Sequence, residues 1–192
     1  MKSIFQIVLV LVLCGLTQAY VITFEDITDD TYYVGDSFVS GGVQITGEEF
    51  FWTGGGSTVS GSATVQASGD AGGTGNEIWF NNINLSFDFS VSPLYGLSLQ
   101  FGDYGGNENI EINGDQRVVD DIASLNGMTI GGVTLTVVDT GTTGALFAVG
   151  SITSFSIGGQ EFSIDNVIAC IPEPASLILL GLGALVLKSR KR

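Results

Sequence analysis

Apolar and polar residues alternate one by one through much of the middle of this 192-residue sequence. In the clearest run, four apolar residues alternate with three polar ones: Leu85, Phe87, Phe89 and Val91 with Ser86, Asp88 and Ser90. A period of two puts the apolar groups on one face of a β-strand and the polar groups on the other. Shorter runs repeat the pattern at 97–101, 110–112, 133–137, 155–157 and 162–164.

Glycine and asparagine separate these runs, and residues 20–170 show no sustained helical stripe apart from a turn near 120–125. Strands with one polar face are typical of antiparallel sheets. The pattern therefore predicts an all-β fold, and we expect an antiparallel jelly-roll β-sandwich of about eight strands.

Paired glycines predict where the chain turns. Gly158-Gly159 between two alternating runs indicates a two-residue hairpin, because such turns require positive φ angles. Gly41-Gly42 and Gly131-Gly132 predict further turns into strands. Residues 54–75 are rich in small residues and favour either a long mobile loop or a flat edge hairpin with Val59 and Val65 facing inward.

The charges are distributed very unevenly. The formal net charge is −14, and Arg117 is the only Lys or Arg between Tyr20 and Ile171, whereas every acidic residue except Glu173 lies there. Such a domain does not bind nucleic acid, since that binding depends on Lys and Arg contacts to phosphate. It suits divalent cations or cationic partners, or the charge serves solubility alone.

Both ends of the sequence indicate export. Residues 1–19 have the positive charge, apolar core and small-x-small site of a signal peptide, with cleavage expected after Ala19. The run 175–187 is uncharged and apolar, and a basic cluster follows it, which predicts a membrane helix with its cationic end in the cytoplasm. The alternative is a C-terminal core helix. We thus expect a signal peptide (1–19), an acidic β-sandwich domain (20–170) and a C-terminal segment (171–192).

The C-terminal segment resembles the PEP-CTERM sorting domain of exported bacterial proteins. The resemblance rests on Pro172, Glu173 and Pro174, followed by the apolar run and the basic end. It implies that exosortase, a membrane peptidase, is a partner and cuts near this motif. The chain would be anchored in the inner membrane through its tail, then released to the envelope, cell surface or extracellular polysaccharide (biofilm) matrix.

Two short motifs near the ends of the domain resemble those of jelly-roll carbohydrate-binding modules. They are Phe24-Glu25-Asp26 and Ile164-Asp165-Asn166-Val167. The resemblance implies that Glu25 and Asp165 hold a structural calcium, with backbone carbonyls completing the shell. A slip in the alternation also predicts a bulge or strand end at Asp165-Asn166. The alternative is a solvated aspartate at a strand edge.

A sugar-binding platform would need exposed aromatic side chains. The candidates are Trp52, Trp79, Tyr95 and Tyr104, of which Tyr104, in a glycine-rich loop, is best placed to face solvent. The alternative is that these side chains pack in the core.

Catalysis is disfavoured because the chain has no histidine, which excludes Ser-His-Asp and Cys-His sites and His-ligated zinc. We expect a structural or adhesive surface module rather than an enzyme. The alternatives are a carbohydrate-binding module and a glycoside hydrolase, which needs only paired carboxylates. Those available are Glu48, Glu49, Glu108, Glu111, Asp120 and Asp121.

Overall fold

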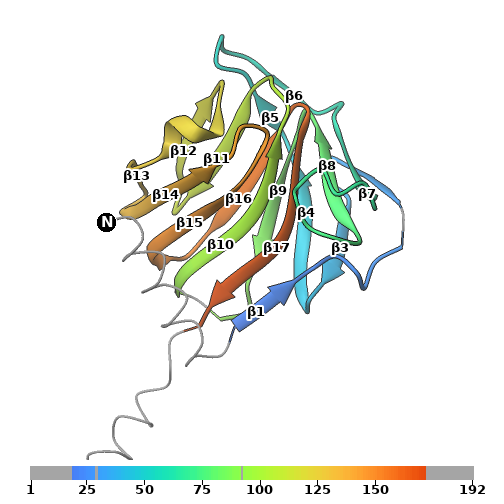
Figure 1. Ribbon diagram of the computed structural model, residues 1–192, viewed down its shortest axis with the longest axis horizontal. Helices are drawn as coiled ribbons and strands as arrows, with labels where there is room; N and C mark the ends of the chain where they lie inside the picture. Colours follow the sequence, from blue (N-terminus) through green and yellow to red (C-terminus); the bar gives the residue numbers. More distant parts are fainter. Residues whose placement is uncertain (1–18, 29, 92, 172–192) are drawn as a thin grey trace, which may run out of the picture.

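The structure is a computed structural model, and it describes residues 19–28, 30–91 and 93–171. Within these residues the chain folds into two large antiparallel sheets and one small hairpin (Figure 1). The nine-stranded sheet contains β1 (Ala19–Ile22), β2 (Thr31–Tyr33), β7 (Ser62–Gln66), β8 (Glu77–Asn81), β10 (Leu94–Asp103), β13 (Thr129–Ile130), β14 (Val133–Asp139), β15 (Thr143–Ile152) and β17 (Phe162–Cys170).

The six-stranded sheet contains β3 (Ser37–Ser40), β4 (Val43–Glu48), β9 (Ile83–Asp88), β11 (Glu108–Ile112), β12 (Asp115–Val119) and β16 (Phe155–Gly159). Its strand order is β12-β11-β16-β9-β4-β3, and that of the larger sheet is β13-β14-β15-β10-β17-β8-β7-β2, with β1 also paired to β17. The hairpin consists of β5 (Phe50–Phe51) and β6 (Ser57–Thr58), and a 3-10 turn, η1, spans Ile122–Leu125.

One hydrophobic core lies between the two sheets. Alternation explains it: Leu97, Leu99 and Phe101 of β10 are buried, as are Ile110 and Ile112 of β11 in the facing sheet. Each such side chain contributes about 1.5–3 kcal/mol by leaving water. The expectation of an all-β antiparallel sandwich is confirmed. The expected number of about eight strands is wrong, because turns divide the chain into many more short strands.

Two of the three glycine-pair predictions are confirmed. Gly41-Gly42 and Gly131-Gly132 join neighbouring strands with φ angles of 57° and 76°, and 54° and 80°. Gly158-Gly159 is not a hairpin turn: both glycines lie within β16, and the chain crosses to β17 in the other sheet. A Cβ on Gly158 would lie 2.0 Å from the Ile83 carbonyl oxygen, so close strand packing requires this glycine.

The segment 54–75 combines strands and an anchored loop. Val65 points inward from β7 and is 2% exposed, as the edge-hairpin alternative predicts, whereas Val59 is 64% exposed, contrary to that alternative. The predicted turn near 120–125 is η1. Of the expected signal peptide only Ala19 is described, and the expected tail helix lies outside the described residues. Among those residues, no helix is long and apolar enough to cross a membrane.

Candidate functional site

The first part of the site is the turn that follows β1. Phe24 has a φ of 60° and a fully buried side chain, and its carbonyl oxygen accepts from the Ile27 amide at 3.2 Å. This turn leaves Glu25 exposed. Asp26 ties the turn to the β3–β4 hairpin, because its carboxylate accepts from Ser40 Oγ at 2.5 Å and from the Gly41 amide at 2.8 Å.

The second part of the site is the bulge in β17. The register between β10 and β17 shifts between Ser98 and Gln100, and Asn166 has a φ of 51°. The predicted bulge at Asp165-Asn166 is therefore confirmed. The Asn166 backbone amide donates to Asp165 Oδ1 at 2.6 Å, and Asn166 Nδ2 donates to Oδ2 at 2.8 Å.

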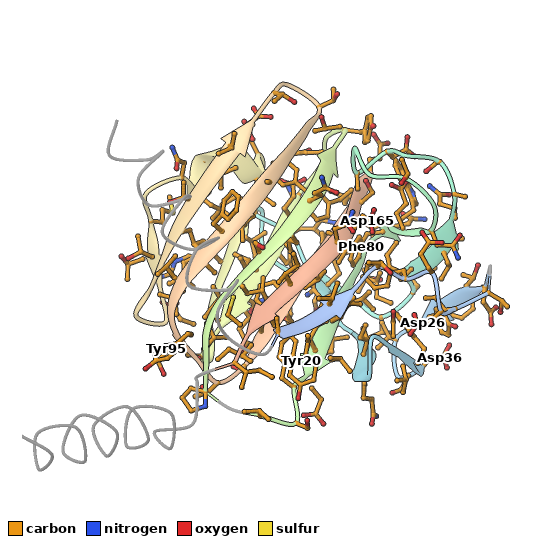
Figure 2. All side chains as sticks on the ribbon, turned by 60° about the horizontal axis from the view of Figure 1, so that its bottom comes forward. Tyr20, Asp26, Asp36, Phe80, Tyr95 and Asp165 are labelled. Atoms are coloured by element: carbon orange, nitrogen blue, oxygen red, sulfur yellow. The ribbon has the colours of Figure 1, made fainter. Side chains whose placement is uncertain are left out.

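Strand register brings the two predicted calcium ligands together. In the antiparallel pairing of β1 with β17, Ile22 lies opposite Val167, so continuing the register carries the residues after β1 toward Asp165. Figure 2 labels Asp165 on β17 and Asp26 on the segment that follows β1. Sequence separation hides this proximity, and only the pairing of the two terminal strands creates it.

A glycine loop, residues 67–76, closes over both carboxylates. A Cβ on Gly73 would lie 2.0 Å from Asp165 Oδ2, and a Cβ on Gly75 would lie 1.8 Å from Glu25 Oε1. The Asn76 amide also donates to Glu25 Oε1 at 2.8 Å. Only residues without a side chain allow the backbone to approach the two carboxylates so closely.

Glu77 holds this loop in place, although no sequence pattern singled it out as a functional residue. Its buried carboxylate accepts from the Asp70 and Ala71 amides, both at 2.8 Å, and from Ser68 Oγ. The available signal was a single acid between a glycine-rich run and the apolar stretch 78–80. Because its oxygens hold the backbone, Glu77 is a structural anchor of the glycine loop.

Negative charge at the site has no basic side chain beside it among the residues that the structure describes. Burial raises the pKa of Asp165 to about 6, and the charges of Glu77 and Glu25 add to this, against a hydrogen bond from Asn166. Arg117, the only Lys or Arg in the described residues, pairs instead with Asp115. No three Asp, Glu, His or Cys side chains in the described ranges converge to hold a metal by themselves. A cation here would need Glu25, Asp165 and other oxygen donors, which fits calcium.

The structure brings two of the four candidate platform residues together. The rings of Trp79 and Tyr104 lie 5.7 Å apart at 39°, and Tyr104 Oη donates to the Asp70 carbonyl at 3.0 Å. Tyr104 is 41% exposed and Trp79 is half-buried. Trp52 is not part of this pair: it packs edge-on against buried Phe50 of the β5–β6 hairpin.

A shallow hollow of about 250 Å³ borders the glycine loop. Its lining includes Ala71 and Gly72 of the loop, with Gln100 of β10 and Thr143 of β15. Gln100 also accepts a hydrogen bond from Asn166 Nδ2 at 2.6 Å. The glycine loop thus borders both an aromatic pair and this hollow.

The carboxylates considered for glycoside hydrolysis lie in different environments. Glu48 and Glu111 extend from the outer face of the six-stranded sheet. Burial raises the pKa of Glu48, a hydrogen bond from Ser86 lowers it, and the negative charge of Glu111 raises it further. Glu49 is exposed and accepts from Ser57 Oγ. Asp120 accepts from Thr53 Oγ1 at 2.8 Å, and Asp121 caps η1.

Glu108 differs from all of these. Its side chain is 1% exposed and neither carboxylate oxygen has a hydrogen-bond partner. Burial raises its pKa to about 8, and Asp103, Asp121 and Asp120 add to the shift.

Comparison with known proteins identifies the C-terminal segment. Residues 171–192 match the PEP-CTERM protein-sorting motif. This motif implies export, a membrane-anchored sorting signal and processing by exosortase. No curated protein and no solved structure matches the chain. The matched residues carry Pro172, Glu173 and Pro174 and, except for Ile171, lie outside the described residues.

Proposed function

We propose that this protein is an exported envelope or matrix component, released by exosortase, whose acidic sandwich is a calcium-stabilised structural or adhesive module of the jelly-roll type. The match of residues 171–192 to the sorting motif supports the route. The convergence of Glu25 and Asp165 under the glycine loop supports the calcium. Signal-peptide removal, inner-membrane anchoring through the tail and delivery to the surface or polysaccharide matrix belong to the same proposal.

The route is tested by intact mass and cell fractionation. The native protein is compared with a variant carrying Pro172→Ala, Glu173→Ala and Pro174→Ala. We expect the wild type to lose the segment after about residue 172 and to leave the membrane fraction, whereas the variant stays full-length and membrane-bound. An uncut wild-type chain in the membrane contradicts processing and makes the tail a permanent anchor.

Calcium binding is tested by the melting temperature of the full chain with calcium and with EDTA. A ligand that binds only the native state adds about 2.7 kcal/mol of stability at 100 times its Kd. Glu25→Gln with Asp165→Asn removes both carboxylates and should abolish the calcium response of this site. Asp88→Asn, on exposed Asp88 of β9, is the matched control and should leave the response unchanged.

Carbohydrate binding is a second candidate function, favoured by the Trp79–Tyr104 pair. An exposed ring over a half-buried one, bordered by the polar glycine loop, offers an apolar face for a pyranose ring. The test is tryptophan fluorescence during titration with the polysaccharide of the producing cell. Tyr104→Ala should weaken binding at least fivefold, or about 1 kcal/mol.

Tyr95→Ala is the control for this test. Tyr95 is 64% exposed and lies near the start of β10, whereas Tyr104 follows the end of that strand. Figure 2 shows Tyr95 far from Asp165. Equal weakening by both substitutions, or no binding by the wild type, would leave the structural and adhesive role without a sugar platform.

A further inference from the structure

Two acidic side chains from opposite sheets point into the sandwich at the same end. Asp103 continues the inward series of Leu99 and Phe101 on β10. Glu108 continues the inward series of Ile112 and Ile110 on β11. Residues 104–107 connect these strands directly, so the two carboxylates lie where the chain passes from one layer to the other.

The hydrogen-bond donors at this end bond to aspartates and leave Glu108 without a partner. Asp103 accepts from the Gly105 amide at 3.1 Å and from the Ile122 amide at 3.2 Å. The Asp120 carboxylate accepts from Thr53 Oγ1 at 2.8 Å and from Asn107 Nδ2 at 2.6 Å. The Asp121 carboxylate accepts from the Ala123 amide at 2.7 Å. Both oxygens of buried Glu108 therefore lack a donor.

A buried ionised carboxylate is stable only when it is paired or coordinates a metal. The carboxylates that act most strongly on Glu108 are those of Asp103, Asp121 and Asp120, all of the same sign. No basic side chain in the described part of the chain compensates them, since Arg117 is exposed and bonded to Asp115. A divalent cation would satisfy Glu108 and relieve the repulsion together.

We propose that Glu108 and Asp103 hold a second calcium ion between the ends of the two sheets. Asp120 and Asp121 surround this site with negative charge, and backbone or water oxygens complete its shell, as calcium accepts six to eight oxygen ligands in irregular geometry. The ion links the nine-stranded sheet to the six-stranded sheet. This site is separate from Glu25 and Asp165 and does not depend on the calcium proposed there.

Calorimetric titration of the metal-free full chain with Ca²⁺ tests the proposal. Glu108→Gln should bind one calcium ion fewer per chain than the wild type. Glu111→Gln is the matched control, because Glu111 lies on the same strand but bonds to the Gly114 amide and Ser154 Oγ. Its calcium count should equal that of the wild type. The Glu25→Gln, Asp165→Asn variant should keep the ion held by Glu108.

The outcomes separate the two calcium sites. An unchanged count in folded Glu108→Gln overturns the proposal. So does a Glu25→Gln, Asp165→Asn variant that folds but binds no calcium, which would mean that Glu108 is buried as a neutral acid. Near-ultraviolet circular dichroism establishes folding. Should Glu108→Gln fail to fold, Asp103→Asn, which leaves Glu108 in place, must lose one ion or the proposal fails.

Discussion

The two carboxylate sites of this sandwich differ in what surrounds the charge. Asp165 is buried, but both of its oxygens accept hydrogen bonds from Asn166. Glu108 is equally buried, and neither of its oxygens accepts any. A bulge supplies donors at the first site, whereas regular strand geometry and competing aspartates withhold them at the second. The number of nearby N–H donors therefore decides whether a buried carboxylate is hydrogen-bonded or left without a partner.

The pH dependence of stability offers the largest expected difference between the two sites. In excess EDTA, both acids ionise at lower pH in the unfolded chain than in the folded one, so stability falls as pH rises. For Asp165 this loss spans pH values from about 3.8 to about 6, and for Glu108 from about 4.5 to about 8. The free energy of unfolding, measured with urea, should therefore fall by about 2–3 kcal/mol between pH 6 and 8 because of Glu108.

Substitution at each site isolates the contribution of that site to the pH dependence of stability. Glu108→Gln should flatten the profile between pH 6 and 8, whereas Asp165→Asn should flatten only the part below pH 6. A Glu108→Gln profile that keeps the wild-type slope would show that Glu108 does not titrate as its burial requires. Calcium should reduce the slope in the wild type, since a bound cation favours the ionised form.

The next largest effect concerns the close packing of the glycine loop. Gly73→Ala places a methyl group 2.0 Å from Asp165 Oδ2, and should cost about 2 kcal/mol in metal-free stability and abolish the calcium response at that site. Gly54→Ala is the control, because nothing lies within 4 Å of its added Cβ. Thermal unfolding with calcium and with EDTA measures both effects. Equal behaviour of the two variants would contradict the close approach.

Glu77→Gln tests the anchor of the glycine loop. The amide replaces a charged acceptor of two backbone N–H groups, so we expect a loss of about 1.5 kcal/mol in stability. Hydrogen exchange of the Asp70 and Ala71 amides should become faster, while exchange in β11 stays unchanged. Unaltered exchange at both amides would show that Glu77 does not restrain the loop.

Arg117→Ala should have the smallest effect. Its partner Asp115 is 35% exposed and Arg117 is 46% exposed, and an ion pair at such a surface contributes about 0–1 kcal/mol. Calcium titration should be unchanged, because Arg117 compensates neither carboxylate site. A large shift in either the melting temperature or the calcium count would mean that the positive charge of Arg117 acts at long range on one of the two carboxylate sites.

Local patterns were sufficient for some features of this protein. The alternation of Leu97, Leu99 and Phe101 predicted an inward strand face, and the slip after Ile164 predicted the bulge at Asp165-Asn166. Gly41-Gly42 predicted a turn. The same signal was wrong at Gly158-Gly159, because a glycine also serves where two backbones approach, and the neighbour that approaches is distant in the sequence.

The sequence alone determined that the chain is an antiparallel β protein with a sorting motif at residues 171–192, since period-two patterning and a short linear motif are local properties. Tertiary structure alone decided which acids meet. The pairing of β1 with β17 and the closure of the glycine loop bring Glu25 and Glu77 close enough to Asp165 for their charges to raise its pKa. The facing of two sheets brings Asp103 to Glu108. Strand order and layer packing are set by contacts between residues far apart in the chain, and no local pattern contains them.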